Sequence, residues 1–205
     1  MNTNQRSNSK NDSTLQLKDL DRSLRYSYED YYSWKFTDKV ELIDGQIFSY
    51  NKEIVLLSHQ EILGNIFIQI ASFLKGKTAK VIVGPLDVHF KNKETYTVLQ
   101  PDICVICDKS KLDARGCIGA PDLVIEILSP GNSKMELLHK YRVYEEFGVK
   151  EYWIVSQSDQ NILIYTLNKE GKFQPSKIFT LSEKITSSVL PGFELVLDDV
   201  FEDID

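Results

Sequence analysis

Cysteine is scarce in this chain, and long hydrophobic runs are missing. The three cysteines among 205 residues cannot all pair with one another, and the N-terminus has no apolar core of the signal-peptide type. We therefore expect a reducing compartment, the cytoplasm. The longest apolar stretch, around residues 62–74, is interrupted by polar residues and glycine, and it falls short of the roughly 20 apolar residues that span a bilayer. This pattern predicts no membrane partner.

An excess of positive charge is also missing. The formal net charge is −6 and the isoelectric point is near 5.2. A protein of this charge does not attract nucleic acid through its whole surface, so any such contact must come from a local patch.

The length and the hydrophobic content predict one globular domain. A chain of 205 residues with 42% hydrophobic residues can build a single sizeable core. Residues 1–20 are dominated by Asn, Ser, Lys, Asp and Gln, a composition that cannot offset the entropy cost of ordering. We predict a disordered tail over residues 1–20 and a single domain over residues 21–205.

Hydrophobic periodicity predicts a mixed α/β fold. Capping-box patterns indicate a short aromatic helix after Ser27 and a longer helix after Ser58 that ends near Gly76. An Asp-Gly turn at residues 44–45 indicates a hairpin. Runs rich in β-branched residues predict a central sheet from the ranges 80–83, 86–90, 103–107, 123–128 and 152–155. A helix over residues 134–147 makes a crossover between the last two strands, and residues 162–167, 173–181 and 190–197 read as antiparallel strands at one edge.

Two carboxylates stand out against this sheet. Glu126 lies between two isoleucines in a strand that reads as fully buried, so it needs a metal ion, a cationic partner or several hydrogen-bond donors. Asp102 follows a proline and precedes the apolar run of another strand. Carboxylates on adjacent strands beside an amine can bind a divalent metal and activate water, which predicts a metal-dependent phosphodiesterase. A purely structural ion pair at Glu126 is the alternative interpretation.

A lysine on the following helix is the candidate amine. At about 100° per residue, Lys140 projects between Tyr144 and Phe147 on the apolar face, toward the sheet. A lysine there either snorkels past the edge of the core or places its charge near the carboxylates, and we favour the second because Glu126 requires a partner. Lys134 projects toward the same stripe and competes with Lys140 for this role.

Two further residues are possible cleft residues. His59, just inside the second helix, and Glu41, on the early hairpin, are candidates for phosphate or metal contacts at the cleft mouth. For His59, a role in extending the helix start is an equal alternative.

Four sequence blocks carry a resemblance to a known family. They are residues 41–45, the Pro101-Asp102 pair, residues 121–130 and residues 148–155. In this order they resemble the Uma-type restriction endonuclease family, a bacterial branch of the PD-(D/E)XK nuclease superfamily, over about residues 26–201. The resemblance implies a restriction-endonuclease-like α/β fold, with a mixed central sheet flanked by helices and extra antiparallel strands at the C-terminal edge.

The resemblance also implies an activity and a cofactor. Asp102, Glu126 and the backbone carbonyl of Ile127 would ligate Mg²⁺ or Mn²⁺, and the substrate would be DNA, cut by hydrolysis to leave a 5′-phosphate. The usual superfamily motif has a lysine two residues after the glutamate, where this chain has Leu128. In the family resembled here, a lysine from the next helix is thought to substitute, and Lys140 matches its position.

Two other functions fit the same residues. One is a catalytically inactive DNA-binding or dimeric regulatory module of the same fold, which the acidic charge and the missing motif lysine favour. The other is a hydrolase of a small phosphorylated substrate, which suits an acidic surface better than a duplex does. A homodimer is expected only by analogy with nucleases that pair to cut both strands.

Overall fold

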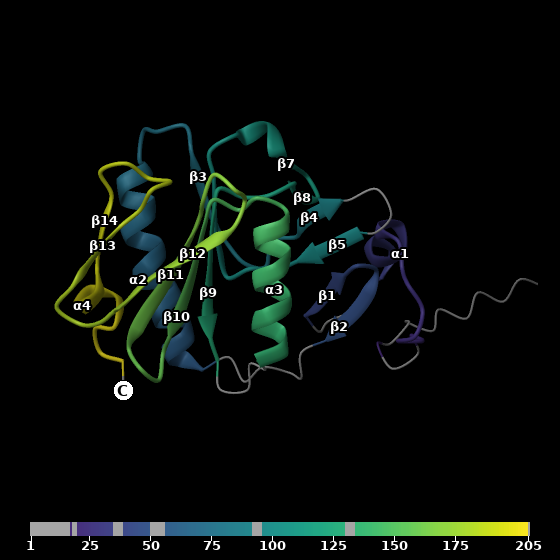
Figure 1. Ribbon diagram of the computed structural model, residues 1–205, viewed down its shortest axis with the longest axis horizontal. Helices are drawn as coiled ribbons and strands as arrows, with labels where there is room; N and C mark the ends of the chain where they lie inside the picture. Colours follow the sequence, from purple (N-terminus) through teal and green to yellow (C-terminus); the bar gives the residue numbers. More distant parts are fainter. Residues whose placement is uncertain are drawn as a thin grey trace, which may run out of the picture.

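Two mixed six-stranded sheets form most of the structure, a computed structural model that describes residues 17, 20–34, 39–49, 56–91, 96–129 and 134–204. Figure 1 shows the two sheets side by side. The C-terminal elements β13, β14 and α4 lie next to the sheet that contains β9 to β12. Most of the tail predicted over residues 1–20 lies outside the described residues. Among the described helices, none is long and apolar enough to cross a membrane.

The central sheet has the strand order β12-β11-β10-β9-β6-β3. Its strands are β3 (Lys80–Val83), β6 (Ile103–Ile106), β9 (Leu123–Leu128), β10 (Glu151–Ser156), β11 (Asn161–Leu167) and β12 (Phe173–Phe179). Only β9 and β10 pair in parallel among the pairs of this sheet in the described chain, and α3 (Lys134–Glu146) makes the crossover between them. This mixed α/β arrangement and its antiparallel edge strands β11 and β12 confirm the prediction.

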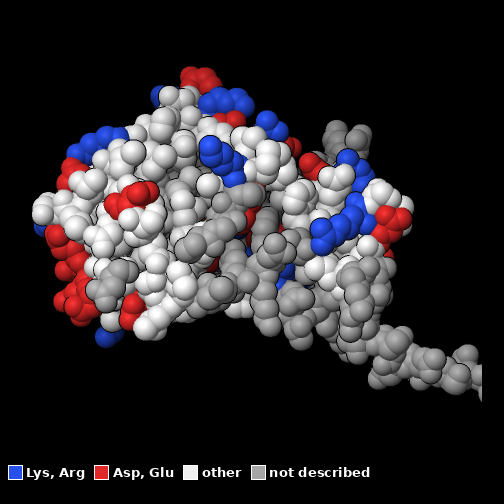
Figure 2. All heavy atoms as spheres, turned by 90° about the horizontal axis from the view of Figure 1, so that it is seen from below, with Lys and Arg blue, Asp and Glu red and all other residues white. Residues whose placement is uncertain are grey.

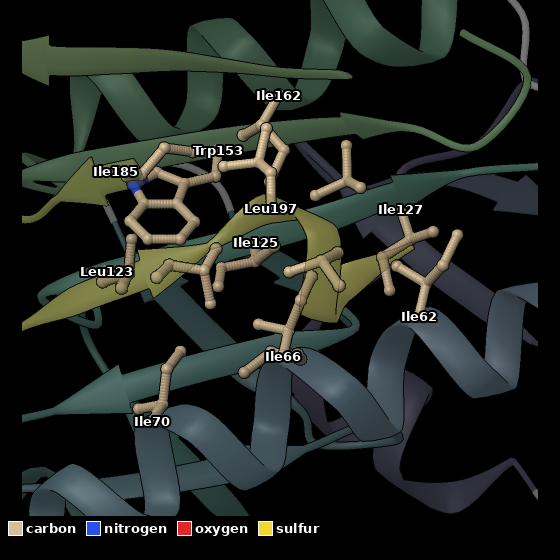
Figure 3. Packing of buried hydrophobic residues seen from close by; sticks show 14 of the residues in the cluster. Ile62, Ile66, Ile70, Leu123, Ile125, Ile127, Trp153, Ile162, Ile185 and Leu197 are labelled. Atoms are coloured by element: carbon tan, nitrogen blue, oxygen red, sulfur yellow. The ribbon is translucent and has the colours of Figure 1, made fainter. Parts of the chain in front are cut away.

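Helices cover both faces of the central sheet, so the alternate residues of β9 meet different neighbours. Leu123, Ile125 and Ile127 belong to a buried cluster with Ile62, Ile66 and Ile70 of α2 (Leu57–Leu74), which Figure 3 shows from close by. Val124, on the other face, packs with Val143 and Tyr144 of α3. Since strand side chains alternate between faces, Glu126 points to the α3 side.

The second sheet corrects one part of the predicted topology. Its order is β2-β1-β5-β4-β8-β7. Its strands are β1 (Val40–Ile43), β2 (Gln46–Ser49), β4 (Val88–Lys91), β5 (Tyr96–Leu99), β7 (Leu112–Asp113) and β8 (Gly116–Ile118), with a short 3₁₀ turn, η2 (Lys109–Lys111), before β7. The hairpin of β1 and β2 is confirmed. The run at residues 86–90 was wrongly assigned to the central sheet, because β propensity identifies a strand but not its partner.

The C-terminal elements form a small separate layer. Strands β13 (Lys184–Thr186) and β14 (Glu194–Val196) pair only with each other among the described strands, and α4 (Leu197–Val200) follows them. Leu195 and Leu197 are fully buried in the cluster that contains the apolar side of α2. Residues 190–197 therefore cover α2, and the prediction that they extend the sheet edge was wrong.

The helix starts differ in how they are capped. Ser27 and Asp30 form the predicted capping box at the start of α1 (Tyr28–Ser33). The predicted box at Ser58 is wrong, because α2 begins at Leu57 and has no side-chain cap. Instead, the hydroxyl of Ser58 accepts a hydrogen bond from the side-chain amide of Gln157. Ser58 thus ties α2 to the end of β10.

A buried carboxylate just before β9 gives a first prediction. The carboxylate of Asp122 accepts hydrogen bonds from the Lys150 ammonium (2.7 Å) and the Cys107 backbone N–H (2.8 Å). Burial raises the pKa of Asp122, but these bonds and the lysine charge outweigh it and lower the pKa below its ordinary value. A lowered pKa contributes stability above the unfolded-state pKa, about 3.9, and the contribution disappears as the pH falls through the folded-state pKa.

We expect Asp122→Asn to lower the free energy of unfolding by about 1–3 kcal/mol at pH 7, since it weakens hydrogen bonds to a buried charge. Urea denaturation at pH 7 and near pH 3 measures the effect, which should shrink at the lower pH. Asp108→Asn is the matched control, because Asp108 is exposed and bonds only within its own turn in the described structure. An equal loss of stability at both pH values would contradict the linkage.

Candidate active site

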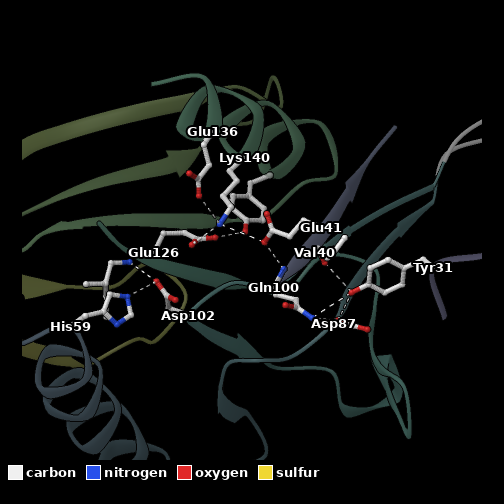
Figure 4. A network of polar contacts seen from close by, with 12 residues as sticks. Tyr31, Val40, Glu41, His59, Asp87, Gln100, Asp102, Glu126, Glu136 and Lys140 are labelled. Atoms are coloured by element: carbon white, nitrogen blue, oxygen red, sulfur yellow. Dashed lines mark hydrogen bonds and ion pairs between the residues drawn. The ribbon is translucent and has the colours of Figure 1, made fainter. Parts of the chain in front are cut away.

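The ion pair between Glu126 and Lys140 is the centre of the site. Glu126 on β9 is 5% exposed and Lys140 on α3 is 2% exposed. The Lys140 ammonium donates a hydrogen bond to Glu126 Oε2 over 3.0 Å (Figure 4). The crossover places α3 over the end of β9, so the inward-facing lysine meets the inward-facing carboxylate.

Two more glutamates approach the same ammonium group. Lys140 Nζ lies 3.6 Å from Glu41 Oε1 and 3.7 Å from Glu136 Oε1. Glu41 comes from β1 of the second sheet, and Glu136 lies one helical turn before Lys140 on α3. We call Glu41, Asp102, Glu126, Glu136 and Lys140 the charged cluster. The cluster joins both sheets and the crossover helix.

A tyrosine completes the surroundings of Glu126. The hydroxyl of Tyr144 donates to Glu126 Oε1 over 2.7 Å. Burial raises the pKa of Glu126 and neighbouring carboxylates raise it further, while the Lys140 charge lowers it, and the pKa ends above its ordinary value. Each carboxylate oxygen of Glu126 therefore accepts a hydrogen bond, although the raised pKa shows that the carboxyl group resists ionisation.

Asp102 lies in the segment just before β6. Its Oδ2 atom accepts a hydrogen bond from the Ile127 backbone N–H (2.7 Å) and lies 3.5 Å from Nε2 of the buried His59. Burial raises the pKa of Asp102, but contact with His59 and the charges of Lys39 and Lys140 lower it more, so the pKa lies below its ordinary value. Asp102 is thus held as a carboxylate beside the end of β9.

A close backbone contact positions the segment that carries Asp102. The Gly84 N–H donates to the Asp102 carbonyl over 2.7 Å. A Cβ atom at Gly84 would lie 2.7 Å from the carbonyl oxygen of Pro101, too close for any side chain. Only glycine allows the end of β3 to approach the segment this closely.

Glu41 is supported by a polar network that reaches α1. Its Oε1 accepts from the Gln100 backbone N–H (2.8 Å), and the Gln100 side-chain amide donates to Asp87 Oδ1 (2.8 Å). The Tyr31 hydroxyl also donates to Asp87 Oδ1 (3.1 Å), as Figure 4 shows. Glu41 is fully buried, and its second oxygen, Oε2, has no hydrogen-bond partner in the part of the chain that the structure describes. One side of Glu41 is anchored and the other lacks a donor.

The structure separates the two candidate lysines. Lys134 is the first residue of α3 and is exposed. Lys140 lies six positions later, which corresponds to about 9 Å along the helix axis. Lys140 therefore lies in the charged cluster, while Lys134 faces solvent. The other predicted site residues, Glu41, His59, Asp102, Glu126 and Ile127, come together around the end of β9.

Sequence reasoning missed three residues of the site. Glu136 and Tyr144 lie four residues before and after Lys140, and this spacing on one helical face was a usable signal. Tyr144 was assigned only to the apolar stripe. Gln100 contacts Glu41 through its backbone, which the side-chain pattern does not reveal.

The surface view agrees with the charge expectation. Figure 2 shows the lower face of the molecule, where Lys and Arg side chains are scattered among acidic ones outside the grey residues. The charged cluster is largely buried, so it contributes little to this face.

Two known proteins are similar to this chain. A crystal structure described as "a putative nuclease belonging to DUF820" from Anabaena variabilis is similar, with a TM-score of 0.68 and 21% identity, over 84% of this chain and 96% of that one. This likeness shows a shared fold, consistent with the restriction-endonuclease-like prediction. An uncharacterized protein, slr1290, from Synechocystis sp. is 27% identical over 150 residues, 72% of this chain and 77% of that protein.

A family model covers most of the chain. The model of the Uma2 family, described as "Putative restriction endonuclease", matches residues 28–198. This span contains every residue of the charged cluster, and it supports a nuclease-like function. The chain therefore belongs to the Uma2 family.

Proposed function

We propose that this protein is a metal-dependent endonuclease that hydrolyses phosphodiester bonds in DNA. The observation that carries the proposal is the charged cluster itself: carboxylates on β1, β9 and α3 meet one buried lysine. Burial of so many charges costs free energy, and functional sites are where such arrangements are usually found. Membership of the Uma2 family directs the assignment toward nucleic-acid cleavage.

The charged cluster is rich in carboxylates. Glu41, Glu126 and Glu136 lie within 4 Å of Lys140 Nζ, and the charge of Lys140 also acts on Asp102. Oε2 of Glu41 has no hydrogen-bond partner among the described residues, and oxygen atoms of this kind are the ligands that a hard divalent cation prefers.

The donor atoms suit Mg²⁺ or Mn²⁺. We assign Asp102, Glu126 and the backbone carbonyl of Ile127 as the residues that would hold the ion. No group of three Asp, Glu, His or Cys side chains in the described residues forms a ready metal site. Mg²⁺ does not require one, because it usually keeps several waters and binds one or two carboxylates. When bound, such an ion polarises the scissile phosphate and lowers the pKa of water.

Lys140 would act on the attacking water and on the phosphoryl group of the substrate. Its ammonium group is held among Glu41, Glu126 and Glu136, so its direction is set before a substrate arrives. A preorganised cation at this point would orient the attacking water and stabilise the negative charge that develops on the phosphoryl group. Cleavage would leave a 5′-phosphate, as the superfamily resemblance implies.

One observation favours a second candidate, a protein of this fold that does not cleave. Both oxygens of Glu126 already have donors, Lys140 and Tyr144, so the pair also works as a structural ion pair. In that case the protein would bind DNA or a partner subunit without hydrolysis.

A cleavage assay tests the proposed function. The protein is incubated with supercoiled DNA circles and with single-stranded circles, in Mg²⁺, in Mn²⁺ and in EDTA. We expect nicking or linearisation only with metal. Intact circles under all conditions, in a protein that binds Mg²⁺ in calorimetry, would favour the non-cleaving module. Hydrolysis of nucleotides but not of circles would indicate a small phosphorylated substrate.

A further inference from the structure

A cavity lies directly beyond Glu126 along the central sheet. Its volume is about 310 Å³, and it is lined by Leu128, Ser129, Leu137, Ser156, Gln157, Ser158 and Asp159. Leu128 follows Glu126 by two positions on β9, so both side chains point to the α3 face, about 7 Å apart along the strand. Ser156 lies opposite Leu128 in the parallel register. The cavity therefore continues the candidate active site at the C-terminal ends of β9 and β10.

Its lining does not suit an anion. Among the described residues that line it there is no lysine or arginine, and Asp159 adds a negative charge. Repulsion by this carboxylate and by the charged cluster next to it disfavours a phosphate group here. Leu128 and Leu137 offer apolar surface, while Ser158 and Gln157 add polar atoms to the lining. An uncharged molecule with both apolar and polar parts, such as a nucleobase, fits this chemistry.

The polar part of the lining is already held in place. The Ser156 hydroxyl donates to Asp159 Oδ2 over 2.8 Å, and the Gln157 amide donates to Ser58 on α2. These bonds join the turn after β10 to itself and to α2, so the wall needs little rearrangement to receive a ligand.

We propose that this cavity is a nucleobase subsite. The inference rests on the proposed function, because it takes the phosphodiester to lie at Asp102 and Glu126 and places the base of an adjacent nucleotide in the cavity. A base that is paired and stacked in a duplex cannot enter, so the substrate must be single-stranded or carry an unpaired nucleotide at the cut. Contacts to bases also supply affinity that an acidic protein lacks toward the phosphate backbone.

The test compares DNA with and without bases. One probe is a fluorescent twelve-residue oligothymidylate, and the other is a chain of equal length and charge made of abasic deoxyribose phosphates. Fluorescence anisotropy is measured with Ca²⁺, which takes oxygen ligands as Mg²⁺ does, and a gel checks that the probes stay intact. We expect the oligothymidylate to bind about tenfold more tightly, in line with the free energy of base contacts. Annealing it to its complement should remove this advantage.

A cavity-filling variant tests whether the preference for bases arises in this cavity. Ser158→Trp places an indole in the cavity from the exposed turn after β10 and should abolish the preference for bases. Thr186→Trp, at an exposed position of β13, is the matched control and should keep the preference.

The outcomes separate the two proposals. Equal binding of both probes, or an unchanged preference in Ser158→Trp, would overturn the base subsite while metal-dependent cleavage of circles still supports the nuclease. If the native protein neither binds nor cleaves DNA, the proposed function is overturned instead.

Discussion

Lys140→Met is expected to lower the free energy of unfolding by about 3–5 kcal/mol and to slow DNA cleavage by about 10²- to 10⁴-fold. The substitution keeps much of the side chain's apolar length but leaves Glu41, Glu126 and Glu136 without the ammonium group that lies among them. Three buried carboxylates would then repel one another, and the attacking water would lose its orienting cation. Urea denaturation in EDTA measures the first effect and the circle assay the second.

A surface lysine provides the matched control for this variant. Lys184 forms an ion pair with Glu194, and both side chains are more than half exposed. Lys184→Met should therefore change stability by no more than about 1 kcal/mol. Equal losses in the two variants would show that burial of Lys140 among carboxylates has no special energetic role. Adding Glu126→Gln to Lys140→Met should restore part of the stability, because it removes one of the carboxylates that faced the ammonium group.

Glu126→Gln is expected to abolish stabilisation by Mg²⁺ together with cleavage. A ligand that binds only the folded state, present at 100 times its dissociation constant, raises the free energy of unfolding by about 2.7 kcal/mol. The native protein should gain about this amount at such a Mg²⁺ concentration. The amide has the shape of the carboxylate but not its charge, so its neutral oxygen attracts a divalent cation less strongly. Thermal unfolding of both proteins across a Mg²⁺ titration measures the difference.

The same variant should be milder than Lys140→Met when no metal is present. Lys140 would keep Glu41 and Glu136 as partners, and burial already opposes the charged form of Glu126 by raising its pKa. Glu194→Gln, at an exposed position, is the control and should respond to Mg²⁺ as the native protein does. A native Mg²⁺ response in Glu126→Gln would remove this residue from the metal site.

The core of the central sheet was predictable because its signals are local. Apolar runs of the right length identified β9 and β10, and the helical spacing of apolar residues identified α2 and α3. The pairing of β4 with β5 and β8 was not predictable, since strand partners are chosen by contacts far apart in sequence. The C-terminal layer over α2 escaped prediction for the same reason.

The residues of the candidate site were likewise predictable only where their signals are local. The cost of an unpaired charge in a buried strand was enough to predict that Glu126 needs a partner, and helical geometry directed attention to Lys140. Tyr144 was read as a core residue because its ring is apolar, although its hydroxyl bonds Glu126. The support of Glu41 by Gln100 and Asp87 depends on loop conformations, which no periodicity describes.

The spread of the charged cluster along the chain has a consequence for biosynthesis. Glu41 enters from the first hairpin and Lys140 from the crossover helix, and β10 must then join β9 before α3 is held in place. Contacts so distant in sequence form late, because each requires the closure of a long loop. A nascent chain that ends before β10 would contain every residue of the charged cluster but not the strand that pairs with β9 after the crossover, so we expect the cluster to assemble only once β10 has been made.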